Sequence, residues 1–430
     1  MALESTRPSL VDDRSVPLHG RTAQHGVTGL DKWLATRVQR VIDPVDVRLE
    51  LWDGTSPFAG SRRAVGDIIV RDRLALVGLV VDPDLYFGEA YMAGRLDVRG
   101  DFETVIEALS RSSSPLGSWR ERLRTALALP NTLHRARHNI HHHYDLGNWF
   151  YQQWLDRELV YTCAYYAVPG MTLEEAQRAK MDLVCRKLRL APGMTVVEAG
   201  CGWGALALHM ARHYGVRVKA FNVSKEQLAY ARERARREGL DAQVEFIDDD
   251  YRNIRGEYDV FVSVGMLEHV GLHMFSALAE VIRRCLRRDG GRGLLHFIGR
   301  DSPRPLNAWV RKRIFPGAYP PTLAEVTSRV LVPAAMTVVD VENLRLHYAR
   351  TLDAWRGRYE GSIDQVRAEY GPVFERAWRL YLAGSEAAFA TGWLQLFQVV
   401  FTPFETRPPY WARSEAMLDR EGRPCFAATH

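Results

Sequence analysis

The sequence predicts an α/β protein with a doubly wound sheet at its centre, a small α+β domain before it and mostly helical additions after it. Two observations support this prediction. Strand and helix patterns alternate between residues 172 and 299, which is typical of a parallel sheet with helices on both faces. A glycine-rich turn also lies between the first strand of this series and the helix that follows it.

The part before residue 116 is expected to hold a tail and one small domain. Residues 1–27 lack an apolar core, so we expect a disordered tail rather than a signal peptide. Residues 28–115 are expected to form the small α+β domain, and a basic helical linker should follow over 116–142. The domain shows strand-like alternation at residues 47–52, 67–81 and 94–102.

The central domain is expected over residues 143–405. Its first long helix covers 172–190, where Thr172 and Glu175 have the spacing of a capping box. Strands are expected at 195–200, 216–224, 242–250, 258–266 and 291–299, and helices at 204–215, 225–239 and 275–288. Beyond residue 320 the chain is expected to be mostly helical, with a loose tail over 406–430.

Composition limits the classes of function. The chain has 430 residues, a net charge of +5 and five scattered cysteines without a CxxC pair. This pattern indicates neither a disulfide framework nor a zinc site, and it favours a reducing compartment. The longest apolar run, from Leu74, is too short to span a membrane. Adjacent histidines at 141–143 do not converge easily on one ion, so no metal is expected.

The positive charge is concentrated in two segments. Residues 118–145 contain five arginines and five histidines, and residues 307–321 combine Arg311, Lys312 and Arg313 with aromatic side chains. Basic residues beside aromatic residues suit an anionic lipid surface. The alternative is a solvated helix face. Nucleic acid is not expected, because no recognised binding motif accompanies the charge.

The glycine-rich turn indicates a nucleoside ligand. Gly200, Gly202 and Gly204 let the backbone approach a ligand closely. Their spacing differs from that of pyrophosphate-binding turns, and Asn222 stands where a dinucleotide-binding fold usually has an acidic residue. A nucleoside without phosphate fits best, which points to S-adenosylmethionine. Glu198, just before the turn, would orient the turn or the positive end of the cofactor.

Polar residues follow several predicted strands, at the edge of the sheet where such folds bind ligands. Each of them alone is more often a loop cap or a satisfied buried group, but together they favour a site beside the glycine turn. They are Asn222, Asp249, Asp250, Tyr251, Glu268, His269 and His296.

Beyond these patterns, the chain resembles the cyclopropane-fatty-acyl-phospholipid synthases and the related mycolic acid cyclopropane synthases. The resemblance implies a class I methyltransferase Rossmann-like domain, and "GEAYMAGRLDV" resembles the N-terminal domain of the phospholipid-acting branch. Matching segments run in family order: "HYDLGNWF", "YTCAYY", "EAGCGWGAL", "SKEQ", "DYRNI", "SVGMLEHVG", "LLHFIG", "IFPGAYPP", "HYARTLDAW" and "LQLFQVVF".

The resemblance also implies roles for individual residues. S-adenosylmethionine would contact eight of them: Tyr161, Thr162, Gly200, Gly202, Asn222, Gln227, Tyr251 and Arg252. A bicarbonate ion would be held by Cys163, Glu268, His296, Tyr348 and the backbone of Ile298. The segment "YTCAYY" would then be a lid between cofactor and anion. Phe297 stands where the family usually has threonine, and we expect it beside the reacting region.

The implied activity is cyclopropane formation at the double bond of an unsaturated phospholipid acyl chain. Bicarbonate would be the base, and the enzyme would lie on the cytoplasmic face of the membrane. The resemblance also implies a homodimer. Three alternatives remain open at this point. They are an acyl C-methyltransferase that gives a methyl or methylene branch, a small-molecule methyltransferase, and a lipid-binding protein without catalysis.

Overall fold

The computed structural model describes residues 26–58, 64–112 and 146–406. The chain divides into two compact units, and each takes its residues from several parts of the sequence. The first contains residues 1–126, 304–316 and 352–393, and the second contains residues 127–303, 317–351 and 394–430. Residues 1–25 of the expected tail over 1–27, the linker and most of the C-terminal tail lie outside the described residues.

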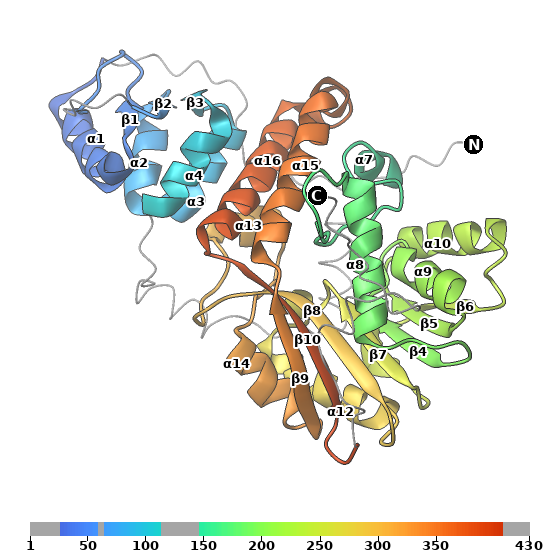
Figure 1. Ribbon diagram of the computed structural model, residues 1–430. Coiled ribbons are helices and arrows are strands. Elements are labelled where there is room, and N and C mark those ends of the chain that lie inside the picture. Colours follow the sequence, from blue (N-terminus) through green and yellow to red (C-terminus); the bar gives the residue numbers. More distant parts are fainter. Residues whose placement is uncertain (1–25, 59–63, 113–145, 407–430) are drawn as a thin grey trace, which may run out of the picture. The chain divides into compact units, whose positions relative to one another are not determined.

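The first unit is built around a three-stranded sheet in the order β1-β2-β3 (Figure 1). Strand β1 (Val47–Glu50) pairs in parallel with β2 (Gly66–Val70), which pairs antiparallel with β3 (Leu96–Gly100). Its helices are α1 (Gly29–Ile42), α2 (Arg73–Val81), α3 (Pro83–Met92), α4 (Phe102–Ser112), α13 (Ala308–Arg313) and α16 (Ile363–Thr391). The expected α+β character is therefore present.

Part of the strand pattern predicted over residues 67–81 is a helix. Only the first residues belong to β2, and the apolar run that follows forms α2. The side chain of Asp72 caps this helix, because its carboxylate accepts a hydrogen bond from the backbone N–H of Ala75 at 2.9 Å. Periodicity alone does not separate a buried helix from a strand in so short an apolar run.

Two segments that lie late in the sequence complete the first unit. Arg313 on α13 forms a bidentate ion pair with Glu89 on α3, at 2.7 and 2.6 Å. Arg376 on α16 donates to the backbone carbonyl of Leu96 at 2.8 Å. Trp309 is only 3% exposed. The expectation that residues 307–321 present their basic and aromatic side chains to lipid is therefore wrong for Trp309 and Arg313.

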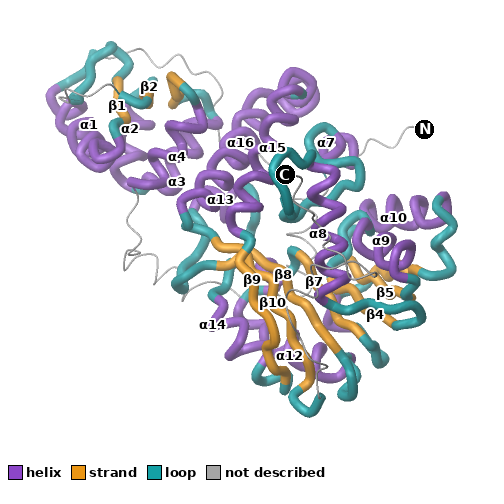
Figure 2. The backbone as a smooth tube through the Cα atoms, viewed as in Figure 1, coloured by secondary structure: helices purple, strands orange, loops and turns teal. Residues whose placement is uncertain are grey.

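The second unit contains a sheet of seven strands, drawn in orange in Figure 2. Their order is β6-β5-β4-β7-β8-β10-β9, and Figure 1 labels all of them. The five predicted strands are present and parallel, but β9 and β10 were not predicted, and β10 pairs antiparallel with both β8 and β9. The bounds are β4 (Thr195–Ala199), β5 (Arg217–Asn222), β6 (Val244–Asp248), β7 (Val260–Val264), β8 (Arg292–Gly299), β9 (Met336–Asn343) and β10 (Gln395–Pro403).

Helices cover both faces of this sheet. Neighbouring residues of β4 enter different apolar clusters, Val196 on one face and Val197 on the other, as the alternation of side chains along a strand requires. The capping box of α8 is confirmed, with Thr172 and Glu175 bonded in both directions. The helices are α7 (Asn148–Gln152), α8 (Leu173–Lys187), α9 (Ala205–Tyr214), α10 (Lys225–Arg237), α11 (Leu267–Val270), α12 (Phe275–Cys285) and α14 (Leu323–Val326).

Helix α15 (Arg345–Gly361) begins in the second unit and ends in the first. No helix within the described ranges is both long enough and apolar enough to cross a membrane.

Candidate active site

The glycine-rich turn joins β4 to α9 at the carboxyl edge of the sheet. Gly200, Gly202 and Gly204 all have positive φ, at 84°, 52° and 83°, a conformation that side-chain-bearing residues rarely adopt. A Cβ atom at Gly202 would meet no heavy atom within 4 Å. The backbone N–H groups of Gly200 and Cys201 donate to the carbonyl of Phe221, at 3.0 and 3.1 Å, which ties the turn to β5.

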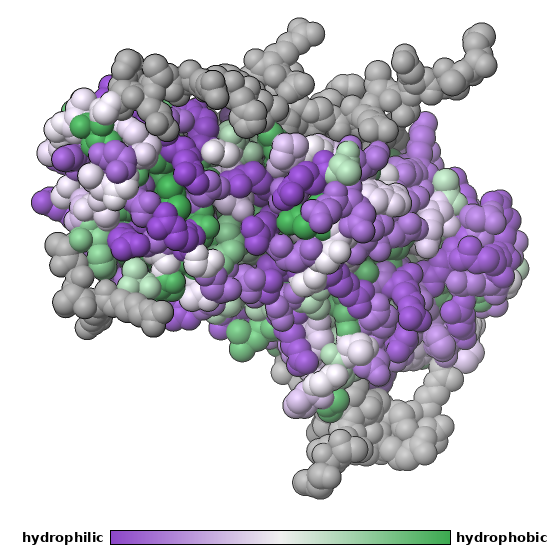
Figure 3. Space-filling model, turned by 90° about the horizontal axis from the view of Figure 1, so that it is seen from above, coloured by the Kyte–Doolittle hydropathy of each residue, from purple (hydrophilic) through white to green (hydrophobic). Residues whose placement is uncertain are grey.

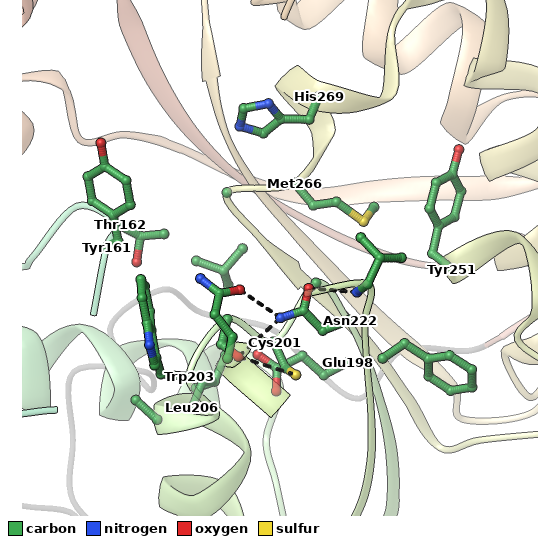
Figure 4. A pocket seen from close by; sticks show the side chains of 18 of the residues that line it. Tyr161, Thr162, Glu198, Cys201, Trp203, Leu206, Asn222, Tyr251, Met266 and His269 are labelled. Atoms are coloured by element: carbon green, nitrogen blue, oxygen red, sulfur yellow. Dashed lines mark hydrogen bonds between the residues drawn. The ribbon is translucent and has the colours of Figure 1, made fainter. Parts of the chain in front are cut away.

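A cavity lies above this turn, and all eight residues expected to contact the cofactor line it. The space between its walls, part of it open solvent, is about 1170 Å³. In Figure 4, Tyr161 and Trp203 lie on one side of the cavity and Tyr251 on the other, with Asn222 and Glu198 between them. The lid segment, the turn and three strand ends thus meet at one place. The lining also includes Lys180, Glu198, Trp203, Met266 and His269.

Asn222 organises the polar wall of the cavity. Its Nδ2 donates to the carbonyl of Gly202 at 3.2 Å and to Oε1 of Gln227 at 2.8 Å. Three buried polar atoms of the lining have no partner among the described residues, namely Glu198 Oε2, Gln227 Nε2 and the hydroxyl of Tyr251. Open donors and acceptors on three lining residues suit a nucleoside with an amino-acid chain, so the site fits S-adenosylmethionine.

Lys180 is a site residue that the sequence reasoning missed. It is buried on α8, lines the cavity, and donates from Nζ to Oγ1 of Thr162 at 2.9 Å. Burial lowers the pKa of Lys180 to about 8 and raises the pKa of Glu198 to about 8. Lys180 shares one face of α8 with Ala176, Val184 and Lys187, which are buried. This helical spacing of buried positions is the signal that could have revealed it.

The lid segment is bonded to the first turns of α15. The backbone N–H of Ala164 donates to Oγ1 of Thr351 at 3.0 Å. The thiol of Cys163 lies 4.0 Å from the carbonyl of Leu344, which also accepts the backbone N–H of Tyr348. Cys163 is thereby placed beside the turn that carries Tyr348. Burial raises the pKa of the Cys163 thiol far above its usual range, so it stays neutral and can only be a weak donor.

Glu268, Ile298 and His296 form a second group. The backbone N–H of Ile298 donates to Oε1 of Glu268 at 3.5 Å, and strand alternation puts Ile298 and His296 on the same face of β8. Both Glu268 Oε2 and His296 Nε2 are buried without a partner among the described residues. Burial raises the pKa of Glu268 to about 7 and lowers that of His296 well below its usual value.

Thr162, the neighbour of Cys163 in the lid segment, lies close to a residue that is bonded to the backbone of His296. The backbone N–H of Gly265 donates to the carbonyl of His296 at 2.9 Å, and a Cβ at Gly265 would lie 2.7 Å from Cγ2 of Thr162. None of the five expected anion ligands belongs to the lining of the cofactor cavity, although Cys163 and Glu268 directly adjoin lining residues. The contacts do not bring the side chains of Cys163 and His296 together directly.

Phe297 does not lie where we expected it. It points to the face of β8 opposite His296 and is fully buried, with its ring 5.7 Å from that of Phe397. The ring belongs to the apolar cluster under the sheet. Phe297 therefore contributes to packing rather than to the reacting region.

Comparison with known proteins identifies the family of the chain. A model of the mycolic acid cyclopropane synthetase family matches residues 131–399, which is more than half of the chain. The chain belongs to this family. It is therefore an S-adenosylmethionine-dependent methyltransferase, and its seven-stranded sheet is the class I methyltransferase Rossmann-like fold. A second model, of a domain of unknown function (DUF7884), matches residues 35–117.

The relatives of this chain indicate fatty acids as the substrate class. A probable fatty acid methyltransferase of Pseudomonas putida is 36% identical, covering 82% of this chain and 91% of the relative. The cyclopropane-fatty-acyl-phospholipid synthase of Escherichia coli K12 is 36% identical, covering 79% and 88%. The crystal structure of mycolic acid cyclopropane synthase CmaA1 complexed with SAH and CTAB has a TM-score of 0.58 and 30% identity, covering 62% and 97%.

Proposed function

We propose that the protein transfers a carbon from S-adenosylmethionine to the cis double bond of an unsaturated phospholipid acyl chain and forms a cyclopropane ring. The observation that carries the proposal is the pair of unpartnered buried atoms beside the cofactor cavity, Glu268 Oε2 and His296 Nε2. Leaving such groups unsatisfied costs about 1–3 kcal/mol each, so a bound ligand is expected to satisfy them.

Bicarbonate suits this pair of atoms. A neutral imidazole donates one hydrogen bond, and a carboxylate only accepts. Bicarbonate offers both oxygen acceptors for the donor and a hydroxyl for the acceptor. The N–H of Ile298 and the Cys163 thiol would supply further donors, as would the Tyr348 hydroxyl. The donor set therefore supports a small oxyanion that carries one proton.

The cofactor, the anion ligands and the lid segment have different roles in the proposed reaction. Bound S-adenosylmethionine supplies an electrophilic methyl group, whose transfer to an alkene leaves positive charge on the acyl chain. Glu268, His296 and Ile298 hold the anion in a buried place beside the cavity, where an electrostatic interaction is stronger than in water. The lid segment excludes water. Ring closure needs a base for one proton of the new methyl group, and the held anion is that base.

A second product has specific support. The relative from Pseudomonas putida is described as a probable fatty acid methyltransferase. If the cation loses a different proton after a hydride shift, the acyl chain gains a methyl or methylene branch rather than a ring. The same cavity and the same anion would serve both outcomes.

Lipid analysis separates these products. We would express the protein in a host rich in monounsaturated phospholipids and identify the modified acyl chain by mass spectrometry. A gain of one CH2 that survives catalytic hydrogenation unchanged indicates the ring, whereas a methylene branch takes up hydrogen. An unmodified acyl chain, with normal binding of S-adenosylmethionine in calorimetry, would contradict the lipid substrate. A protein that binds no S-adenosylmethionine would favour a non-catalytic lipid-binding role.

We also infer that the protein binds an anionic membrane surface, and helix α1 supports this inference. Its exposed face combines Leu30 and Trp33, which are 62% and 51% exposed, with the basic Lys32 and Arg37. The guanidinium of Arg37 lies 4.3 Å above the ring of Trp33. Apolar and basic side chains on one helix face suit an anionic lipid interface. Figure 3 shows apolar residues between hydrophilic ones on the part of the molecule that holds this domain.

Vesicle sedimentation tests this membrane inference. Trp33→Ala is expected to weaken binding to vesicles that contain anionic phospholipid. The matched control is Val332→Ala, which removes an apolar side chain that is 64% exposed in the other unit. Equal binding by both variants and the wild type would place the membrane-binding surface elsewhere.

Location and assembly are part of the same proposal. The four described cysteines are buried free thiols, which supports a reducing compartment and hence the cytoplasmic face of the membrane. A homodimer is supported only by the resemblance. Sedimentation velocity of the purified protein tests it, since a single monomer species across concentrations would contradict it.

A further inference from the structure

A line of buried polar side chains leads from helix α8 through strand β10 to His296. Lys187 on α8 donates from Nζ to Oε1 of Gln398 on β10 at 2.8 Å. Nε2 of Gln398 lies 3.1 Å from Nδ1 of His296, and the strand register places these two residues directly opposite each other. All three side chains are at most 2% exposed, so water does not compete for their hydrogen bonds.

Two carboxylates lie beside the amine of Lys187, at the end of this line of side chains that is farthest from His296. Nζ of Lys187 contacts the side chain of Glu342 and lies 3.6 Å from Oδ2 of Asp340, both on β9. Two carboxylates beside one buried amine favour its ammonium form. An ammonium group has three donors and no acceptor. The oxygen of the Gln398 amide must therefore face Lys187, which settles an orientation that oxygen and nitrogen positions alone leave ambiguous.

The direction of the remaining hydrogen bond follows. With its oxygen toward Lys187, Gln398 presents the amide NH2, which only donates. Nδ1 of His296 must then accept, so it carries no proton. Burial lowers the pKa of His296 well below its usual value and keeps the ring neutral, and the single ring proton is on Nε2. That nitrogen is the buried atom without a partner among the described residues.

We propose that Lys187 and Gln398 are positioning residues that hold His296 in the Nε2–H tautomer, so that the imidazole presents a hydrogen-bond donor to the anion site. The other tautomer would turn a lone pair toward an anion and repel it. The identity of the anion rests on the proposed function, whereas the tautomer rests on the contacts from β9 to His296. Neither Lys187 nor Gln398 lines the cofactor cavity, so both would act on the site only through His296.

Nitrogen NMR tests the tautomer without cofactor or substrate. The ligand-free protein would be labelled with ¹⁵N-histidine, and the His296 signals identified by their loss in His296→Asn. We expect a protonated Nε2 and an unprotonated Nδ1. In Gln398→Glu a carboxylate faces Nδ1 and accepts from it, so Nδ1 should become protonated. Gln398→Met, which removes the donor without adding charge, should give a mixture of tautomers. A wild type protonated at Nδ1, or an Nδ1 signal that neither variant changes, overturns the proposal.

Anion binding tests its consequence. Titration with ¹³C-bicarbonate should show weaker binding in Gln398→Met, by the inverse of the fraction of His296 that keeps the Nε2–H tautomer in the NMR spectrum. Calorimetry should show unchanged affinity for S-adenosylmethionine. The control is Gln395→Met on the same strand. It loses the hydrogen bond from Nε2 to Asp301 at 3.0 Å and the one that Oε1 accepts from Nδ2 of Asn343 at 2.9 Å. Equal weakening by both variants would indicate general damage to β10 and overturn the proposal. If the wild type shows the Nε2–H tautomer but binds no bicarbonate, the positioning role is supported and the proposed anion is contradicted.

Discussion

Single residues set the chemistry of this site through burial rather than through unusual residue types. Glu268 and His296 are both taken out of water, and burial moves their pKa values in opposite directions. The result is a carboxyl group whose pKa lies close to neutral pH, in the same group as an imidazole that stays uncharged. Sequence motifs identify these residues but not their ionisation, because ionisation depends on the solvent that the fold excludes.

The role of Glu268 as an anion ligand predicts a separation between turnover and cofactor binding. Glu268→Gln removes an acceptor for the proton on the anion but leaves the lining of the cofactor cavity intact. Turnover on unsaturated phospholipid should fall at least about tenfold, which corresponds to the loss of one hydrogen bond of about 1.4 kcal/mol. Affinity for S-adenosylmethionine, measured by calorimetry, should stay near that of the wild type. Normal turnover would remove Glu268 from the site.

The raised pKa of Glu268 also predicts a pH dependence of stability. The unfolded chain releases this proton near the ordinary pKa of 4.5, whereas the folded chain keeps it until about 7. The folded state therefore loses stability as pH rises between these values, by up to about 3 kcal/mol. Glutamine carries no such proton. The Tm of Glu268→Gln minus that of the wild type should grow from pH 4 to pH 7 and then level off; a constant difference would contradict the buried carboxyl.

At the scale of elements, the turn between β4 and α9 depends on glycine for two reasons. Gly204 has a φ of 83°, and a Cβ there would lie 2.6 Å from Cζ of Phe246 and 2.9 Å from Cβ of Ala231. Gly239 also has a positive φ, 67°, but a Cβ there would meet nothing within 4 Å. An alanine at Gly239 would therefore meet only backbone strain, whereas an alanine at Gly204 would meet backbone strain and overpacking.

A pair of alanine substitutions measures this difference. Gly239→Ala should lower the free energy of unfolding by about 1–2 kcal/mol, the cost of a left-handed alanine. Gly204→Ala should lower it further, by about 1–3 kcal/mol more, because side chains must move apart. Urea denaturation gives both values. Equal losses of unfolding free energy in the two variants would mean that Ala231 on α10 and Phe246 on β6 move apart without an energetic penalty.

Comparison of the elements with the sequence shows which strands and helices local patterns can predict. The five parallel strands were predicted because each is a short buried run between helix signals, and the capping box of α8 was visible in Thr172 and Glu175. Strand β10, whose residues are all buried, was missed because it follows the long helix α16 and stands outside the regular alternation of strands and helices that marks the parallel strands. Lys180 and Lys187 were missed because lysine is rarely buried unless it is paired, and their partners come from other elements.

At the scale of the whole molecule, each compact unit is assembled from distant parts of the chain. Helices α13 and α16 complete the unit that begins with α1. A composition break near residue 115 shows where one stretch of chain ends, but not that later helices return to the same unit. Such packing depends on pairs such as Arg313 with Glu89, which are 224 residues apart. Sequence patterns therefore predicted most of the strands and helices of the central sheet, whereas packing between segments so far apart leaves no local pattern to read.

In the proposed mechanism, a buried oxyanion held by Glu268 and His296 serves the methyl transfer to lipid. The most direct test measures turnover of the purified protein on vesicles of monounsaturated phospholipid after bicarbonate has been removed from all solutions. We predict that turnover falls when bicarbonate is absent and returns when it is added back, and that Glu268→Gln does not show this recovery. Turnover that is independent of bicarbonate in the wild type would contradict the claim.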